Sequence, residues 1–347
     1  MPRDLSDPTY GPHAMQLLVD DVLAALPGEP RVLRDHPEVS VDDNYTALGY
    51  PPDAVTRDAR YTRYTGENRM LRSHTTAMVP PALRLLGTQD GWDDVLLACV
   101  GMVYRRDAVD RVHSGTPHQL DLWRISHHRA DLDELIDAVI TTAVPGLRYR
   151  TTPATHPYTT AGRQVDVLVD GEWLEVAECG LAARHVLRRA WLPDDVHGLA
   201  LGVGLDRLLM LRKGVPDIRL LSSDDPRVAA QMLDLTPYRP VSRHPPVMRD
   251  ISVAVGADAD GETIGDVVRA AVGDLVEEVT VVGETPVSDL PPAAVARLGA
   301  RPDQKNVLLR LVLRHPTRTL TDDDANAARD AAHAAVHEGS QPLTSLR

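Results

Sequence analysis

Two arginines stand where their side chains could grip a nucleotide. Arg105 ends an apolar, β-branched stretch in GMVYRRDAVDRVH, and Arg207 opens an apolar helical segment in GVGLDRLL. A guanidinium at the end of a strand offers a planar, bidentate clamp to a phosphate, and a second arginine can hold the γ-phosphate from the opposite side. Gly202 and Gly204 let a ligand approach the backbone closely. Since a lone arginine is more often a surface ion pair, the surrounding residues carry the prediction.

The sequence gives little support to a metal site built by the protein alone. Its two cysteines, Cys99 and Cys179, are too few for a disulfide framework or a cysteine-based zinc site. Its 14 histidines include no HExxH pair. We therefore expect magnesium that arrives with a nucleotide. Chemistry that depends on positioning and charge neutralisation also fits the lack of a Ser-His-Asp arrangement.

The composition is that of a two-domain protein with one anomaly. The chain has 347 residues, a formal net charge of -13 and no apolar run long enough to span a bilayer, so we expect a cytoplasmic protein. The charge disfavours binding of nucleic acid by bulk electrostatics, although one local face can still be basic. The chain contains 9 Tyr and 4 Trp but no Phe, a residue that protein cores ordinarily use.

Apolar spacing and turn signals predict the elements that must position these residues. Helices are predicted over residues 13–26, 75–86 and 129–144, and a buried strand over 94–105. Asp170-Gly171 is typical of a tight turn between two antiparallel strands. LALGVGLDRLLMLRKG predicts a strand that leads into a helix ended by Gly214. The stretch from about residue 29 to about 69, rich in Pro, Asp, Tyr and Arg, predicts loops.

A proline-rich linker, TPYRPVSRHPP, is predicted over residues 237–246. Beyond it the predicted order is strand 249–255, helix 263–272, strand 277–282, a proline-rich loop, strand 306–315 and helix 321–337. Thr321, with Asp324 three residues later, resembles a capping box at the start of the last helix. This order predicts a small α+β domain of the ferredoxin-like kind.

Several strings, in order and at matching spacing, resemble phenylalanyl-tRNA synthetases of the single-chain organellar type. VYRRDAVDRVHSGTPHQLD resembles their motif 2, ALGVGLDRLLMLRKGVPDIRLL their motif 3, MLRSHTTAM the entry to the amino-acid site and GEWLEVAECG a strand before the active-site floor. SRHPPVMRDISVAV, GDLVEEVTVV and LRHPTRTLT resemble the anticodon-binding domain. The resemblance implies an α+β fold. It comprises a class II synthetase catalytic domain, an antiparallel sheet flanked by helices, over residues 1–236 and a ferredoxin-fold anticodon-binding domain over 247–347.

The resemblance also implies a nucleotide site and a magnesium ligand. Its ATP-binding residues, by position, are Arg105, Asp107, His113, Pro117 and Arg207. The two arginines, as the catalytic pair, would grip the phosphates, and His113 would lie beside them. Asp107 would contact the adenine amino group, and Pro117 takes the place of a phenylalanine that stacks on adenine. Glu175 is the implied magnesium ligand.

The implied amino-acid site comprises His74, Thr76, Gln119, Asp121, Thr152, Ala154 and Ala200. Gln119 and Asp121 would bind the α-ammonium, with His74 and Thr76 on the carboxylate side. The implied reaction is attack of the amino-acid carboxylate on the α-phosphorus of ATP, which gives an adenylate and pyrophosphate, and then transfer to the terminal ribose of a tRNA, by the resemblance tRNA-Phe. We expect a monomer, because no convincing dimer-forming stretch precedes residue 44.

Departures from the family cluster at phenylalanine positions. Thr152 and Ala154 stand where a Phe-Pro-Phe sequence lines the substrate-ring pocket, and Glu178 replaces a glycine beside it. Three hypotheses follow: a phenylalanine-free reserve or inhibitor-resistant enzyme, a paralogue with a pocket widened for another or a non-protein amino acid, or a non-catalytic amino-acid sensor. Ala200, which would limit the ring pocket, favours phenylalanine, and Tyr158 is a candidate to refill the wall.

Overall fold

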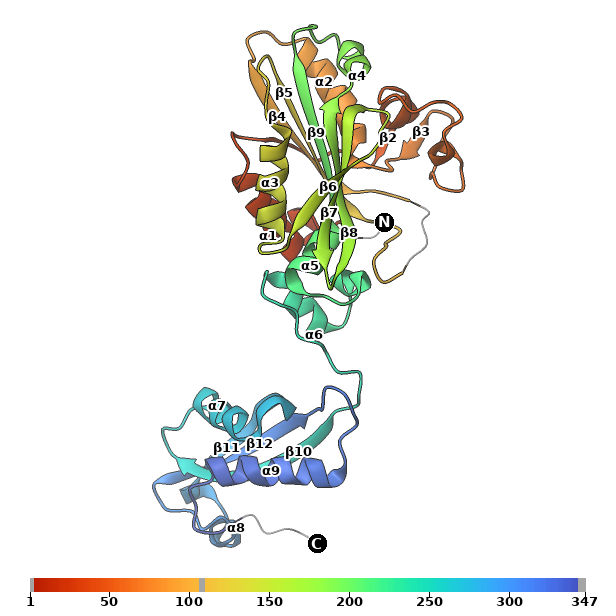
Figure 1. The fold of residues 1–347 in the computed structure, drawn as a ribbon. Coiled ribbons are helices and arrows are strands. Elements are labelled where there is room, and N and C mark those ends of the chain that lie inside the picture. The colour runs from red at the N-terminus through yellow and green to blue at the C-terminus, as the bar shows by residue number, and fades with distance from the viewer. Residues whose placement is uncertain (1–2, 106–109, 343–347) are drawn as a thin grey trace. The chain divides into compact units, whose positions relative to one another are not determined.

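The computed structural model describes residues 3–105 and 110–342. The chain divides into two compact units, Met1–Arg239 and Pro240–Arg347, called here the first and the second unit. The first unit begins at the red end of the colour scale in Figure 1, and the second reaches its blue end. The division falls within the proline-rich stretch of the sequence. No helix among the described residues has both the length and the apolar character that crossing a bilayer requires.

A seven-stranded sheet forms the centre of the first unit. In order across the sheet its strands are β1 (Arg31–Leu33), β4 (Asp94–Met102), β5 (His118–Ser126), β9 (His197–Gly204), β8 (Glu172–Ala182), β7 (Thr159–Val169) and β6 (Tyr149–Pro153). Every neighbouring pair is antiparallel except β1 and β4. The predicted antiparallel sheet with flanking helices is therefore confirmed, with one parallel strand at an edge.

Three helices pack against one another over one face of this sheet (Figure 1). They are α1 (Ala14–Ala24), α3 (Leu132–Ala143) and α5 (Leu205–Lys213). Their ends follow local signals, because His13 and Asp131 cap the first turns of α1 and α3 through their side chains, and Gly214 ends α5 at a φ of 66°. The helices predicted over 13–26 and 129–144 are confirmed with slightly shorter bounds.

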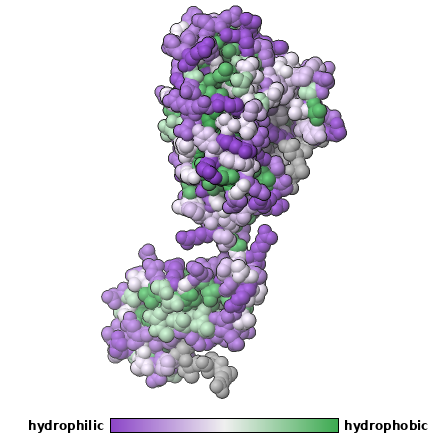
Figure 2. Space-filling view, viewed as in Figure 1, coloured by the Kyte–Doolittle hydropathy of each residue, from purple (hydrophilic) through white to green (hydrophobic). Residues whose placement is uncertain are grey.

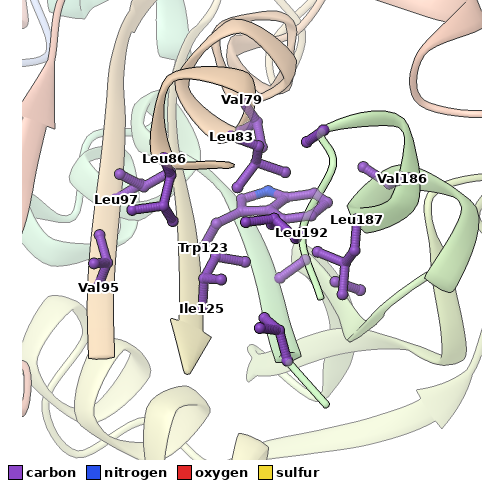
Figure 3. Close-up of a cluster of buried hydrophobic side chains, with 14 of the residues drawn as sticks. Val79, Leu83, Leu86, Val95, Leu97, Trp123, Ile125, Val186, Leu187 and Leu192 are labelled. Carbon is purple, nitrogen blue, oxygen red and sulfur yellow. The ribbon is translucent and has the colours of Figure 1, made fainter. Parts of the chain in front are cut away.

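The opposite face carries a hydrophobic cluster beneath α2 (Val79–Gly87) and α4 (Arg184–Arg189). A 3-10 turn over Thr75–Met78 precedes α2, so the helix predicted over 75–86 begins as a tighter turn. Figure 3 shows the indole of Trp123, on β5, surrounded by side chains of the two helices. Because Trp123 is fully buried, this cluster fixes where β5 lies beneath both helices.

The hairpin predicted at Asp170-Gly171 is confirmed. These residues join β7 to β8 and adopt φ values of 51° and 86°, the positive-φ pair that a tight turn between strands favours. The stretch predicted as loops is wrong in part, because it contains β1, the two-stranded sheet of β2 (Glu38–Ser40) and β3 (Arg69–Leu71), and a π-helical turn over Asp42–Thr46. Strands of three residues are too short for an alternating pattern to identify.

Short helical segments complete the first unit. They cover Pro8–Tyr10, Val55–Arg57, Ile218–Ser222, α6 (Pro226–Ala229) and Ala230–Leu233. Figure 2 shows hydrophilic residues over much of the visible surface of each unit.

The second unit is a three-stranded antiparallel sheet in the order β10-β12-β11, with its own hydrophobic core. Its elements are β10 (Val247–Gly256), α7 (Gly261–Val272), a turn Gly273–Leu275, β11 (Val276–Pro286), a turn Val287–Asp289, α8 (Pro292–Leu298), β12 (Gln304–Leu313) and α9 (Asp322–Val336). The predicted order is confirmed, and the Thr321–Asp324 capping box is present. The proline-rich loop also contains α8, where Pro292 starts the helix.

Candidate active site

The floor of a cavity forms where β9 carries glycines between two strands that carry polar side chains. In the sheet register Asp121 of β5 pairs with Gly202 of β9, and Gly202 pairs in turn with Glu178 of β8. Gln119 pairs with Gly204 in the same way. Directly paired residues project to the same face, so the two glycines leave a gap between the side chains of β5 and β8.

This gap opens into a cavity of about 640 Å³, a size typical of small-molecule sites. Nine of the residues predicted from the sequence line it: His74, Thr76, Arg105, His113, Pro117, Gln119, Asp121, Glu175 and Arg207. They come from β5, β8, α5, the turn before α2 and the segments between β4 and β5. Asp107, the predicted adenine contact, lies outside the described residues.

A β-bulge explains how two carboxylates of β8 reach the same cavity. Val165 of β7 pairs with Ala177 and Asp166 pairs with Glu175, so Val176 is an extra residue in β8. The extra residue restores Glu175 to the face on which Glu178 already lies, and both side chains line the cavity. The alternation of an unbroken strand would have placed them on opposite faces.

Arg207 is held at the cavity by neutral partners. Its Nη1 donates to the backbone carbonyl of Glu175 at 2.8 Å, and its Nη2 lies 2.9 Å from Nε2 of His113. His113 is itself held by Asp110, whose carboxylate lies 2.9 Å from Nδ1. Within the described residues no carboxylate lies at ion-pair distance from Arg207, so its charge is available to an anion.

Arg105 provides a second cation of the same kind. Its Nε donates to the backbone carbonyl of Ser73 at 2.9 Å, and in the described ranges it too has no carboxylate at ion-pair distance. Pro117 also lines the cavity, and its carbonyl accepts from the N–H of Val103 at 2.8 Å. Two guanidiniums in one cavity, neither within ion-pair distance of a carboxylate in the described part of the chain, suit a polyanion such as a triphosphate.

Asp121 is a buried carboxylate on the other side of the cavity. The Thr76 hydroxyl donates to one of its oxygens, and Trp123 Nε1 donates to the other at 2.8 Å. Burial raises the pKa of Asp121 to about 7, while these two hydrogen bonds oppose the shift. A carboxylate poised in this way pairs readily with an ammonium group. Gln119, next to it, accepts from the N–H of Thr75 at 3.2 Å.

His74 is the most conspicuous unsatisfied group of the site. Both ring nitrogens are buried without a hydrogen-bond partner, and the ring stacks on Tyr50 with centroids 5.7 Å apart. Burial, followed by the charge of Arg105, lowers the pKa of His74 to about 3, so the imidazole is neutral at ordinary pH. Buried polar atoms normally have partners, which makes His74 a donor and acceptor that a ligand can satisfy.

Three predicted residues do not line the cavity, contrary to the expectation from the resemblance. Thr152 pairs with Gln164, which pairs with Glu178, so Thr152 lies two strands beyond the cavity edge. Ala154 donates its N–H to the carbonyl of Gly162 at 2.9 Å, on the same outer strands. Ala200 is buried in the Trp123 cluster instead. The strand spacing of the sheet therefore separates Thr152 and Ala154 from the wall, whereas Ala200 lies on β9 itself, where it pairs with Trp123.

Three tyrosines line the cavity, of which the sequence analysis named Tyr158 alone. Tyr50 and Tyr158 line the cavity and pack partly against the Trp123 cluster, so they separate the cavity from the core. Tyr158, which the sequence analysis named as a candidate for the wall, lines the cavity. Tyr61 lies at the cavity too and is 42% exposed. An isolated tyrosine in a loop carries no periodicity, and only its tertiary neighbours reveal its place.

A buried pair fastens the helix of Arg207 to the sheet. His118 Nδ1 lies 3.0 Å from Oδ1 of Asp206, and the His118 N–H donates to the other carboxylate oxygen. The N–H of Leu5 donates to Nε2 of the same ring at 3.0 Å. Because Asp206 directly precedes Arg207, these bonds fix the guanidinium relative to β5. The sequence offered His118 only as part of a longer matching string.

Glu175 fits the magnesium ligand that the resemblance implies. Its carboxylate makes no hydrogen bond to the described residues, and burial together with the charge of Glu178 raises its pKa. Magnesium in nucleotide sites commonly takes one or two carboxylates with phosphate oxygens. No group of three or more potential ligands occurs among the described residues, so a metal here would depend on the nucleotide for further oxygens.

Comparison with protein families identifies a family for each of the two units. Residues 20–232 match the model of "tRNA synthetases class II core domain (F)", and residues 242–341 match that of the "Ferredoxin-fold anticodon binding domain". The core model spans more than half of the chain. The chain therefore belongs to the class II tRNA synthetases and is an aminoacyl-tRNA synthetase. The fold class read from the sequence is confirmed.

The names of similar proteins indicate which class II synthetases this chain resembles. The chain is 26% identical over 353 residues to "Probable phenylalanine--tRNA ligase, mitochondrial" of Drosophila melanogaster, covering 84% of this chain and 74% of that protein. It is 28% identical over 308 residues to "Phenylalanine--tRNA ligase, chloroplastic/mitochondrial" of Arabidopsis thaliana, covering 84% and 67%. Against the "Phenylalanine--tRNA ligase alpha subunit" of Prochlorococcus marinus it is 34% identical over 227 residues, covering 63% and 65%. Its function is accordingly phenylalanine–tRNA ligase-like.

Proposed function

We propose that this chain binds ATP with Mg²⁺, activates an aromatic amino acid to its adenylate and transfers the acyl group to a tRNA. The observation that carries the proposal is one cavity lined by two guanidiniums, Arg105 and Arg207, that have no carboxylate at ion-pair distance among the described residues, and by the buried carboxylate of Asp121. The cations suit the phosphates of ATP, and the carboxylate suits an α-ammonium. Holding both substrates in one cavity supplies the proximity that adenylate formation needs.

The residues would act by positioning and by neutralising charge. An oxygen of the amino-acid carboxylate attacks the α-phosphorus, a new O–P bond forms, and pyrophosphate leaves with the electrons of the broken bond. Arg105 and Arg207 would stabilise the negative charge on the phosphoryl oxygens as it shifts toward the leaving group. Magnesium, when bound with the nucleotide, supplies further charge neutralisation, and Glu175 would hold it.

The proposed acceptor is a tRNA, with tRNA-Phe the first candidate. The second unit matches an anticodon-binding family, and relatives that cover most of the chain are named phenylalanine–tRNA ligases. In the second step a ribose hydroxyl of the tRNA terminus attacks the acyl carbon of the adenylate and AMP leaves. The intact set of arginines disfavours a sensor that only binds an amino acid.

Because the chain contains no phenylalanine, its own translation requires none. This supports the hypothesis of a reserve or inhibitor-resistant enzyme. The exclusion reaches the core, where Tyr45 is fully buried and needs partners for its hydroxyl: the carbonyl of Thr56 at 2.7 Å and the Thr62 hydroxyl at 2.5 Å. Such a reserve or inhibitor-resistant role requires phenylalanine itself as the preferred substrate, whereas a strong preference for another amino acid would favour a paralogue with a widened pocket.

Pyrophosphate exchange with ATP and a panel of aromatic amino acids tests the proposal, followed by charging of unfractionated tRNA. We expect exchange that depends on one aromatic amino acid, and charging of a tRNA with the same amino acid. Absence of exchange together with absence of ATP binding in calorimetry would overturn the proposal and favour the sensor.

A further inference from the structure

Tyr50 and Tyr158 form an aromatic wall on the side of the cavity where the amino acid would bind. Each of these rings carries a polar hydroxyl group. The rings of Tyr50 and Tyr158 lie 6.4 Å apart between centroids, and Tyr158 also lies 6.2 Å from Trp123 of the core cluster. Neither tyrosine hydroxyl makes a hydrogen bond to the described residues. Burial, with the charge of Glu178, raises the pKa of the Tyr50 hydroxyl well above its usual range, so this hydroxyl stays protonated and can donate.

Glu178 adds a carboxylate to this wall. Its side chain lines the cavity and is 45% exposed there. His156, whose Nε2 lies 3.5 Å from Oε1 of Glu178, is at ion-pair distance without forming a hydrogen bond, and its proximity lowers the pKa of Glu178. His156 in turn stacks on Tyr158 with centroids 5.8 Å apart. The carboxylate is thus ionised and keeps acceptor capacity toward the cavity.

The sheet fixes the separation between Glu178 and the ammonium site. Asp121 and Glu178 lie in one row across β5, β9 and β8, on either side of Gly202. Two strand spacings place their backbones about 10 Å apart. That span is comparable with the length of an aromatic amino acid, so a substrate whose ammonium meets Asp121 directs its ring toward Glu178 and the two tyrosines.

An unsubstituted ring would be a poor neighbour for these groups. An apolar ring edge against Glu178 displaces water from an ionised carboxylate without replacing its hydrogen bonds, which is costly. A ring that carries a hydroxyl or an amine donates to the carboxylate and can also accept from a tyrosine hydroxyl. Sites built around such bonds reject the analogue that lacks the donor by large factors.

We propose that Glu178, supported by Tyr50, is the specificity-determining residue of this synthetase and selects an aromatic amino acid whose ring bears a hydrogen-bond donor, either a hydroxyl or an amine. This inference rests on the proposed function, since it names the substrate class of the same cavity. Phenylalanine is then the disfavoured substrate, although the relatives carry its name. Tyr158 lines the wall, and His156, stacked on Tyr158, lies 3.5 Å from Glu178.

Pyrophosphate exchange with matched substrates tests this assignment. The probes are phenylalanine, tyrosine, meta-tyrosine, 3,4-dihydroxyphenylalanine, 4-aminophenylalanine and 4-methoxyphenylalanine, the last being a ring-substituted analogue whose substituent cannot donate. We expect one donor-bearing amino acid to exceed phenylalanine in kcat/KM by about 10²-fold or more, with the methoxy analogue near the phenylalanine value. Phenylalanine as the best substrate of the full-length enzyme would overturn the proposal.

Variants of Glu178 separate a contact with the ring from a contact with the ammonium. E178A should lower kcat/KM for the preferred amino acid by at least about 10-fold and leave phenylalanine unchanged or improved, and E178Q should fall between. Glu172→Ala, an exposed glutamate on the same strand, is the matched control and should change neither. An equal loss for every amino acid in E178A would place Glu178 at the α-ammonium and overturn the proposal.

Calorimetric binding experiments distinguish failure of the Glu178 assignment from failure of the proposed amino-acid activation. If no amino acid supports exchange, the proposed activation fails, and binding of the same probes to the full chain then decides the present inference. Selective weakening of the donor-bearing probe in E178A would sustain it. Equal affinity for that probe and phenylalanine would overturn it. The unfolding midpoint and ATP affinity of each variant establish that the fold is intact.

Discussion

Nη2 of Arg207 lies 2.9 Å from Nε2 of His113, so the start of α5 is joined to the segment between β4 and β5. Because Arg207 is the donor, Nε2 accepts, and the Nδ1 proton of His113 is directed to Asp110. The guanidinium is held in place before any nucleotide binds. Since its partners are neutral, a phosphate can replace His113 without breaking an ion pair.

Arg207→Lys should test this geometry, because lysine keeps the charge but loses the planar fork. We expect pyrophosphate exchange to fall by about 10²-fold, with a higher KM for ATP, since one preorganised donor at developing charge contributes on that order. Arg188→Lys, at an exposed pair with Asp194 on α4, is the control and should retain full exchange. Equal rates for the two variants would exclude Arg207 from the phosphate site.

Asp121 should make amino-acid binding depend on pH. Its pKa of about 7 lies above the usual value of 3.8, so the folded protein keeps this proton between those values while the unfolded chain loses it. The stability contribution is thus present below 3.8 and is lost as pH rises to about 7. An ammonium needs the ionised form, so KM for the amino acid should fall as pH rises from about 6 to about 8. Asp121→Asn should raise KM and flatten the profile; an unchanged slope would contradict this.

Gly202→Ala should block the floor of the cavity. A Cβ at this position would lie 3.3 Å from Oδ2 of Asp121, a tight contact that forces the carboxylate away from the ammonium site. We expect kcat/KM for the amino acid to fall at least about 10-fold, while ATP affinity changes little. Gly283→Ala, where no atom lies within 4 Å of the added Cβ, should leave both quantities unchanged. Full activity of Gly202→Ala would show that the floor is not used.

His74→Leu should make the protein more stable but less active. The imidazole is buried with two unsatisfied nitrogens, so an apolar side chain of similar size removes a desolvation cost. We expect the Tm of the first unit to rise by about 2–4 °C and amino-acid activation to fall at least about 10-fold. The gain should be largest at acidic pH, because the folded pKa of about 3 lies below the usual 6.5, and stability from the neutral ring is lost as pH falls through that window. A lower Tm in the variant would contradict this account.

Leu309→Ala should separate activation from charging of tRNA. Leu309 is fully buried in the core of the second unit, so the substitution should destabilise that unit by about 2–5 kcal/mol. The cavity is lined by the first unit alone, and pyrophosphate exchange should therefore stay within about 2-fold of the parent while aminoacylation falls. Val282→Ala, at an exposed residue of the same sheet, is the control. Loss of exchange in Leu309→Ala alone would show that activation depends on the second unit.

Elements whose signals lie within a few residues were predictable. The Asp170-Gly171 turn, the glycine that ends α5 and the Thr321 capping box each depend on local backbone geometry and appear at the predicted positions. The short strands before residue 71 were not predictable, because three residues show no period.

The resemblance of the sequence predicted the fold class and nine of the residues that line the cavity, because matching strings specify which residues stand at the ends of which strands. The tertiary structure decided which of them share one site. The register across β5, β9 and β8 sets Asp121, Gly202 and Glu178 in one row. Tyr50 and Tyr158 close the wall, while Thr152 lies two strands away. Register depends on side chains packed from distant parts of the chain, and no local pattern encodes it.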